Sequence, residues 1–111
     1  MNNTLVLFTR FGMGDAPAAL QQKLAGIFLT LIGKETPPGV IAFYGEGVKL
    51  TCDGSPVLDQ LRALANQGSR LIICQTCLES FGLRDAVRVG IVGGMGDIVA
   101  AMNGATKVIS V

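Results

Sequence analysis

Five short apolar segments, separated by glycine-rich loops and helical patterns, are the feature that most restricts the fold. Thr4–Thr9 is a continuous apolar run of strand length, the pattern of a strand covered on both faces. Further strands are expected at 40–44, 70–73, 89–92 and 107–111. Because helical segments alternate with them, the sequence predicts an α/β three-layer sandwich with a mostly parallel, flavodoxin-like sheet of about five strands, the first strand being central.

The first helix carries more apolar surface than one buried face requires. It is expected to begin near Ala16, after Asp15 as its N-cap. Its residues at helical spacing are Leu20, Leu24, either Ile27 or Phe28, and Leu31. Phe28, Leu29 and Ile32 widen this surface beyond a single stripe. A helix that is apolar on more than one face needs a second cover, which predicts a homo-oligomer, either a dimer or a trimer.

Size and charge restrict the class of protein. A chain of 111 residues, 50% of them hydrophobic, is expected to form one domain over 1–111. The net charge of +1 gives no reason to expect nucleic acid or an anionic membrane as a partner. The longest apolar run, Leu24–Leu29, is far shorter than the roughly 18 residues of a membrane span. With no basic region or signal-peptide pattern at its start, the protein is expected to be cytoplasmic.

A Cys-x-x-Cys sequence follows the third predicted strand directly. Leu71–Ile73 leads into Cys74-Gln75-Thr76-Cys77. In open α/β domains, ligands and reacting groups gather at the carboxyl ends of the strands. Backbone N–H groups at a helix start favour the thiolate, which is the reactive form of cysteine. We therefore expect Cys74 to be a reactive thiol, with Cys77 as its neighbour.

Several kinds of chemistry use paired cysteines. A zinc site would need further ligands, yet the chain has no histidine and Cys52 is its only other thiol, so we expect no metal. A thioredoxin-like pair would lack the accompanying Trp and the later Pro. A persulfide carrier requires only a reachable, ionisable thiol and no cofactor. The cysteines as small buried hydrophobic residues remain an alternative.

Three charged residues follow predicted strands and are expected at the same edge of the sheet as Cys74. They are Arg10, Glu46 and Lys49. Lys49 or Arg10 would hold a persulfide anion electrostatically, although surface solvation explains each of these side chains equally well. The glycine-rich segment 45–54 is expected to be a functional loop acting as a lid. Cys52 within it is either incidental or a third redox partner.

Three blocks of sequence carry a family resemblance. They are Gly47–Leu50, Gly54–Leu58 and Cys74–Leu78, and two wider features accompany them, Phe43–Val48 after the second strand and the strand end Leu71–Cys74 with Gly82 eight residues later. The chain resembles a DsrE-type domain of the DsrE/DsrF/TusD superfamily and is similar to the C-terminal half of YedF-type sulfurtransferase-like selenium metabolism proteins. The resemblance implies a sulfur-relay protein that assembles as an oligomer, with the persulfide on the cysteine that matches Cys74. It also implies sulfur donor and acceptor proteins as partners, among them a TusA-like carrier.

The sequence therefore leads to one main functional hypothesis and two alternatives. The main hypothesis is a cytoplasmic sulfurtransferase-like sulfur carrier with Cys74 as acceptor and Cys77 as auxiliary or resolving thiol. The first alternative is a non-catalytic oligomeric interaction module with structural cysteines. The second is small-molecule binding at the two Gly-Met-Gly-Asp loops, residues 12–15 and 94–97, for which helix capping is the competing explanation.

Overall fold

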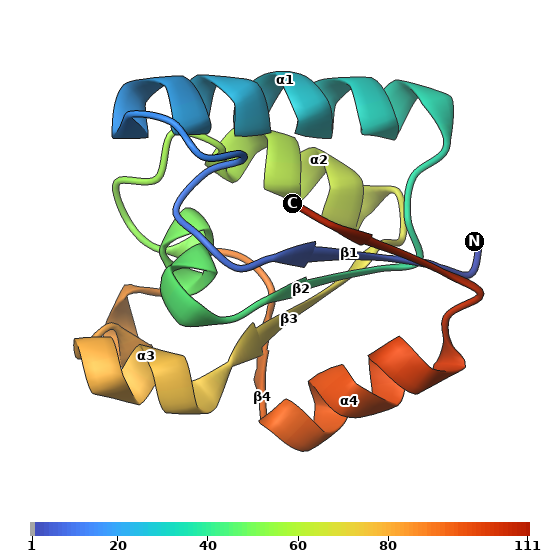
Figure 1. The fold of residues 1–111 in the computed structure, drawn as a ribbon. Coiled ribbons are helices and arrows are strands. Elements are labelled where there is room, and N and C mark those ends of the chain that lie inside the picture. Colours follow the sequence, from blue (N-terminus) through green and yellow to red (C-terminus); the bar gives the residue numbers. More distant parts are fainter. Residues whose placement is uncertain (1) are drawn as a thin grey trace.

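A computed structural model describes residues 2–111, which form a five-stranded parallel sheet between two layers of helices (Figure 1). The strands are β1 (Thr4–Phe8), β2 (Val40–Phe43), β3 (Arg70–Cys74), β4 (Ile91–Gly93) and β5 (Lys107–Ser110). The α-helices are α1 (Ala18–Glu35), α2 (Leu58–Asn66), α3 (Gln75–Phe81) and α4 (Met95–Gly104), and two 3₁₀ helices are η1 (Gly45–Thr51) and η2 (Arg84–Ala86).

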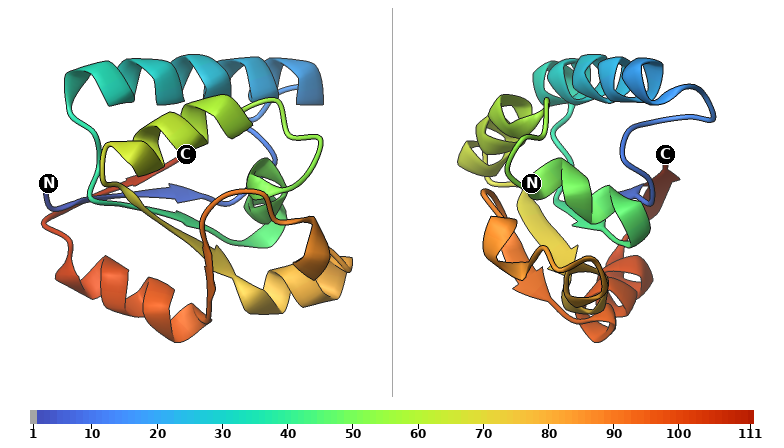
Figure 2. Two further views of the ribbon diagram at one scale, coloured as in Figure 1. Left: turned by 180° about the vertical axis from the view of Figure 1, so that it is seen from behind. Right: turned by 90° about the vertical axis from the view of Figure 1, so that its left-hand side faces the viewer.

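The helices divide between the two faces of the sheet. Helices α1 and α2 cover one face, and α3 and α4 lie on the other (Figures 1 and 2). The predicted three-layer α/β sandwich with a five-stranded parallel sheet is confirmed. None of the helices in the described part of the chain has the length and hydropathy that crossing a bilayer requires.

The order of the strands is β4-β3-β2-β1-β5, so β2 is the central strand. The prediction that the first strand is central is wrong by one position. The side chains of β1 from Leu5 to Phe8 are buried, as expected. That pattern shows coverage on both faces of the strand, but it does not show how many strands lie on each side. The order also differs from the 2-1-3-4-5 order of flavodoxin.

Aromatic packing joins the sheet to α1. The rings of Phe8 and Phe43 stack with their centroids 5.7 Å apart, and Phe28 of α1 meets Phe8 edge-on at 6.2 Å. Ala25 and Leu29 complete the buried side of α1. Burial of these side chains fixes which face of the helix lies on the sheet.

The stripe predicted from the spacing along α1 lies on the opposite, outer side of the helix. Leu20, Leu24, Ile27 and Leu31 are 38–54% exposed. The periodicity detected an apolar face, but α1 has two of them, and the one with Phe28 and Leu29 packs on the sheet. The expected surplus of apolar surface on this helix is therefore present.

Segment 45–54 is packed against the domain and is not a free lid. Its first seven residues form η1, and Val48 and Leu50 within it are fully buried. After η1, Cys52 forms an antiparallel bridge with Val87. The glycines of this segment allow its backbone to lie close to a neighbouring strand. The backbone at Gly47 lies directly against the Phe8 carbonyl group, where a side chain would not fit.

Helix starts differ from their predicted positions by a few residues. The N-cap of α1 is Pro17 and not Asp15, and α4 begins at Met95, ahead of Asp97. The Asp97 carboxylate accepts a hydrogen bond from the Gly94 N–H at 2.9 Å, so this residue caps α4 from inside its first turn. The second Gly-Met-Gly-Asp sequence is therefore a helix start.

Gly47→Ala is expected to destabilise the protein by about 1–3 kcal/mol, because the added methyl group would collide with backbone atoms of Phe8 that cannot rotate away. Urea unfolding measures this loss. Gly96→Ala on α4 is the matched control, since no atom lies within 4 Å of its added Cβ. The control should be neutral or stabilise the helix by up to about 1 kcal/mol. Equal stabilities of the two variants would contradict the close approach.

Candidate functional site

The register of the sheet brings three strand ends to one level. Phe8 pairs with Phe43, and Phe43 pairs with Ile73. Gly45, two residues after β2, and Cys74, the last residue of β3, therefore lie at the same edge of the sheet. Figure 1 shows η1 and α3 next to each other at this edge, as the contacts between the two elements require.

Cys74 is the last residue of β3 and the N-cap of α3. Its side chain is only 1% exposed and belongs to the hydrophobic core, together with Ile73 and Leu78. Since β3 is an inner strand with helices on both faces, a side chain at its end is enclosed. The sequence predicts the position of Cys74 at the strand exit, but the thiol is not at the surface.

Cys77 is the half-buried member of the pair. Its Sγ accepts a hydrogen bond from the Gly45 N–H at 3.1 Å. Cys74, the N-cap of α3, stands three residues before it. Burial raises the pKa of the Cys77 thiol, the Gly45 N–H partly offsets this rise, and the Cys74 side chain adds to it. Of the two thiols, Cys77 is the one that is partly open to solvent.

Gly45 contributes a backbone N–H to the cysteine pair that the sequence pattern does not predict. It has a φ of +58°, and a Cβ there would lie 3.0 Å from the Thr9 carbonyl oxygen. This left-handed conformation favours glycine, and it aims the N–H at Cys77. The glycine-rich sequence Gly45-Glu46-Gly47 after the second predicted strand indicates a functional loop. It does not indicate that the Gly45 N–H is the hydrogen-bond donor.

Glu46 and Lys49 both belong to η1 and interact with each other. Lys49 Nζ lies 2.7 Å from Glu46 Oε1 and 4.8 Å from the centre of the Phe81 ring at the end of α3. The two predicted residues thus lie in the same element as Gly45. The Lys49 ammonium group connects η1 to α3, and its charge is matched by a carboxylate.

Arg10 lies in the loop between β1 and α1. Its exposed guanidinium group donates a hydrogen bond to the Gly14 carbonyl oxygen at 2.9 Å. This contact closes the loop on itself, and no described contact joins Arg10 to the cysteine pair. Its suggested role in holding an anion has no geometric support.

Cys52 is buried, with 3% of its surface exposed, and its thiol donates to the Val48 carbonyl oxygen at 3.3 Å. Burial raises its pKa, while the Thr51 hydroxyl and the Arg88 charge act against the rise. The enclosed position keeps this thiol out of reach of reagents in solution. Within residues 2–111, no three His, Cys, Asp or Glu side chains cluster in a way that would hold a metal ion.

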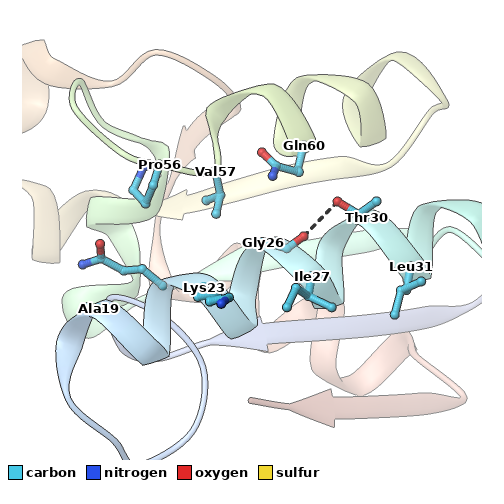
Figure 3. Close-up of a pocket in the computed structure, with 10 residues that line it drawn as sticks. Ala19, Lys23, Gly26, Ile27, Thr30, Leu31, Pro56, Val57 and Gln60 are labelled. Carbon is cyan, nitrogen blue, oxygen red and sulfur yellow. Dashed lines mark hydrogen bonds between the residues drawn. The ribbon is translucent and has the colours of Figure 1, made fainter.

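A hollow of about 580 Å³ lies between α1 and α2 (Figure 3). Ile27 and Leu31 of α1 form one wall, and Val57 and Gln60 contribute the other. No cysteine lines this hollow. It is therefore separate from the cysteine pair.

The chain belongs to the DsrE/DsrF-like family, which matches residues 6–111. Similar solved structures include the ychN protein from E. coli, with 14% identity and a TM-score of 0.73 over 100% of both chains. The protein of unknown function MTH1491 from Methanobacterium thermoautotrophicum has 18% identity and a TM-score of 0.67, covering 99% of this chain and 100% of the other.

The conserved protein of unknown function BT1422 from Bacteroides thetaiotaomicron has 18% identity and a TM-score of 0.64, covering 98% of this chain and 95% of the other. No curated protein matches the chain. At 14–18% identity the solved structures support only the fold. Membership of the DsrE/DsrF-like family is supported by the family match.

Alkylation of the native protein should modify Cys77 first, while Cys52 and Cys74 react only after unfolding, because only Cys77 is partly open to solvent. Its labelling rate should keep rising past the pH at which a free thiol levels off, since burial raises its pKa. Mass mapping of labelled peptides across a pH series measures both effects, with Cys77→Ser as control. Faster native labelling of Cys74 would contradict this arrangement.

Proposed function

We propose that the protein is a sulfurtransferase-like sulfane-sulfur carrier, acting in the cytoplasm through the Cys74–Cys77 pair without a cofactor. The observation that carries this proposal is the pair of thiols three residues apart at the carboxyl edge of the sheet, with the Gly45 N–H donating a hydrogen bond to the Cys77 sulfur. Membership of the DsrE/DsrF-like family, which is generally linked to sulfur relay, supports the same reading.

The proposed chemistry needs little beyond these groups. A thiolate attacks a divalent sulfur, and the sulfur that leaves carries away the electron pair of the broken bond. A hydrogen bond to a charged sulfur favours the charged form, so the Gly45 N–H supports a thiolate or persulfide anion. Neither a histidine base nor a metal ion is required for this exchange.

The proposed partners are sulfur donor and acceptor proteins, among them a TusA-like carrier. The half-open Cys77 suits such a partner, since an exchanging thiol must be presented directly to the sulfur. The resemblance of blocks such as Gly54–Leu58 to YedF-type proteins extends the proposal to selenium metabolism.

Incubation with a low-molecular-weight persulfide should transfer sulfur to the wild-type chain. Intact-mass measurement under native conditions should detect chains that are one sulfur atom heavier. Chains that have already discharged the sulfur should instead carry an internal disulfide, and sulfide should appear in solution. The Cys74→Ala/Cys77→Ser double variant should do neither, whereas Cys52→Ser should behave like the wild type. A wild-type chain as inert as the double variant would remove the proposed function.

The competing proposal, an oligomeric interaction module with structural cysteines, is favoured by one observation. Cys52 and Cys74 are both enclosed in the core, as inert cysteines usually are. This alternative predicts a protein that neither takes up sulfur nor depends on Cys77 for any measurable activity. The same sulfur-transfer experiment therefore separates the two proposals.

We also propose that the outer face of α1 binds a second copy of this chain. Leu20, Leu24, Ile27 and Leu31 follow one another at spacings of four, three and four residues, the repeat of a helix-to-helix seam. This ridge lies beside the hollow between α1 and α2. Because the ridge and the hollow lie on one face, two-fold symmetry would let the ridge of each copy pack into the hollow of the other.

Ile27→Glu should shift the assembly to a smaller mass in light scattering after size exclusion, because it places a charge in the proposed seam. Its circular dichroism should be unchanged, since Ile27 is 48% exposed in the single chain. Asn103→Glu, an exposed position on α4 in the opposite layer, is the matched control. Equal masses for wild type and Ile27→Glu would contradict this assembly.

A further inference from the structure

We infer that Cys77 is the thiol that first takes the sulfur, and that Cys74 is the enclosed thiol that discharges it. This inference rests on the proposed sulfur-carrier function and assigns the two cysteines the opposite order from the one expected from the sequence. It follows from two differences between the thiols, one in access and one in hydrogen bonding.

Access separates the two thiols. Cys74 is 1% exposed and packed with core residues, so a donor would have to open the domain to reach it. Cys77 is half-buried at the outer side of the same pair. Sulfur exchange requires a collinear approach of the attacking and leaving sulfurs, so the partly open thiol is the one that an incoming donor meets.

Hydrogen bonding also favours Cys77 as the loaded position. Its Sγ holds the Gly45 N–H at 3.1 Å, and the described contacts give Cys74 no such backbone donor. A neutral N–H near the sulfur supports negative charge there during attack. Gly45 aims this N–H from a left-handed conformation, with a φ of +58°, in which an added Cβ would lie 3.0 Å from the Thr9 carbonyl oxygen.

The loading step balances without an added oxidant. The Cys77 thiolate attacks the terminal sulfur of a donor persulfide R–S–SH. A new S–S bond forms at Cys77, the donor S–S bond breaks, and its electron pair leaves on the R–S sulfur as a thiolate. Cys77 then carries the persulfide, and the donor is released as a thiol after it takes up a proton.

The discharge step uses the spacing of the two cysteines, because residues at i and i+3 around a helix start are neighbours. The Cys74 sulfur attacks Cys77 Sγ, and the proton of the Cys74 thiol passes to the departing outer sulfur of the persulfide anion. The persulfide bond breaks, hydrosulfide leaves with the electron pair, and a Cys74–Cys77 disulfide forms. A dithiol then returns the pair to two thiols by exchange and is itself oxidised to a disulfide.

Single-turnover sulfur transfer in the absence of dithiol tests the order of the two cysteines. Wild-type protein, Cys74→Ala and Cys77→Ser are each treated with glutathione persulfide, quenched by alkylation and mapped by mass spectrometry, while sulfide is measured in parallel. The double variant gives the background release from the reagent. Cys74→Ala is chosen because alanine removes the sulfur without burying a new hydroxyl group in the core.

We expect Cys74→Ala to retain a persulfide on Cys77 and to release no sulfide above background. Cys77→Ser should take up no sulfur, and the wild type should yield sulfide together with the Cys74–Cys77 disulfide. A persulfide on Cys74 in Cys77→Ser would overturn the inference while leaving the sulfur-carrier function intact. No transfer to any variant or to the wild type would overturn both.

A folding defect in Cys74→Ala does not block the test. In wild-type protein quenched at short times, the first modified peptide should be the one with a persulfide on Cys77, before any disulfide is present. A persulfide found first on Cys74 at those times would overturn the inference.

Discussion

The candidate site depends on the close approach of η1 to the end of β1. The Tyr44 N–H donates to the Phe8 carbonyl oxygen at 3.1 Å, and the backbone at Gly47 packs against the same group. These two contacts hold the start of η1 at the edge of the sheet, with Gly45 between them. The N–H of Gly45 then meets Cys77, so the position of one sulfur is set by main-chain packing more than by any charged side chain.

Much of the fold is predictable from the sequence because buried parallel strands leave a strong local signal. Continuous apolar runs such as Leu5–Phe8 and Leu71–Ile73 mark the strands wherever they lie in the sheet. The order of the strands depends on long-range pairing and leaves no such signal, which is why β2 and not β1 is central. For α1, periodicity identifies apolar faces but does not show which of them packs on the sheet.

The candidate site is predictable in its location and less so in its detail. The sequence places Cys74 at a strand exit, where the register indeed brings several loops together. It does not predict that Cys74 is enclosed and Cys77 half-open, because exposure depends on how η1 and α3 pack over the edge. Nor does it distinguish Lys49, paired with Glu46, from Arg10, which closes its own loop.

The contact between Gly45 and Cys77 involves an amide hydrogen that every residue except proline possesses. Substitutions that alter charge or size around the site therefore leave this donor in place, provided that the backbone keeps its left-handed turn. Evolution can exchange the surrounding side chains, and with them the choice of partner, without dismantling the polar contact to sulfur. Comparisons that score side-chain identity alone will overlook such a determinant, whereas comparisons of backbone torsion at this turn will detect it.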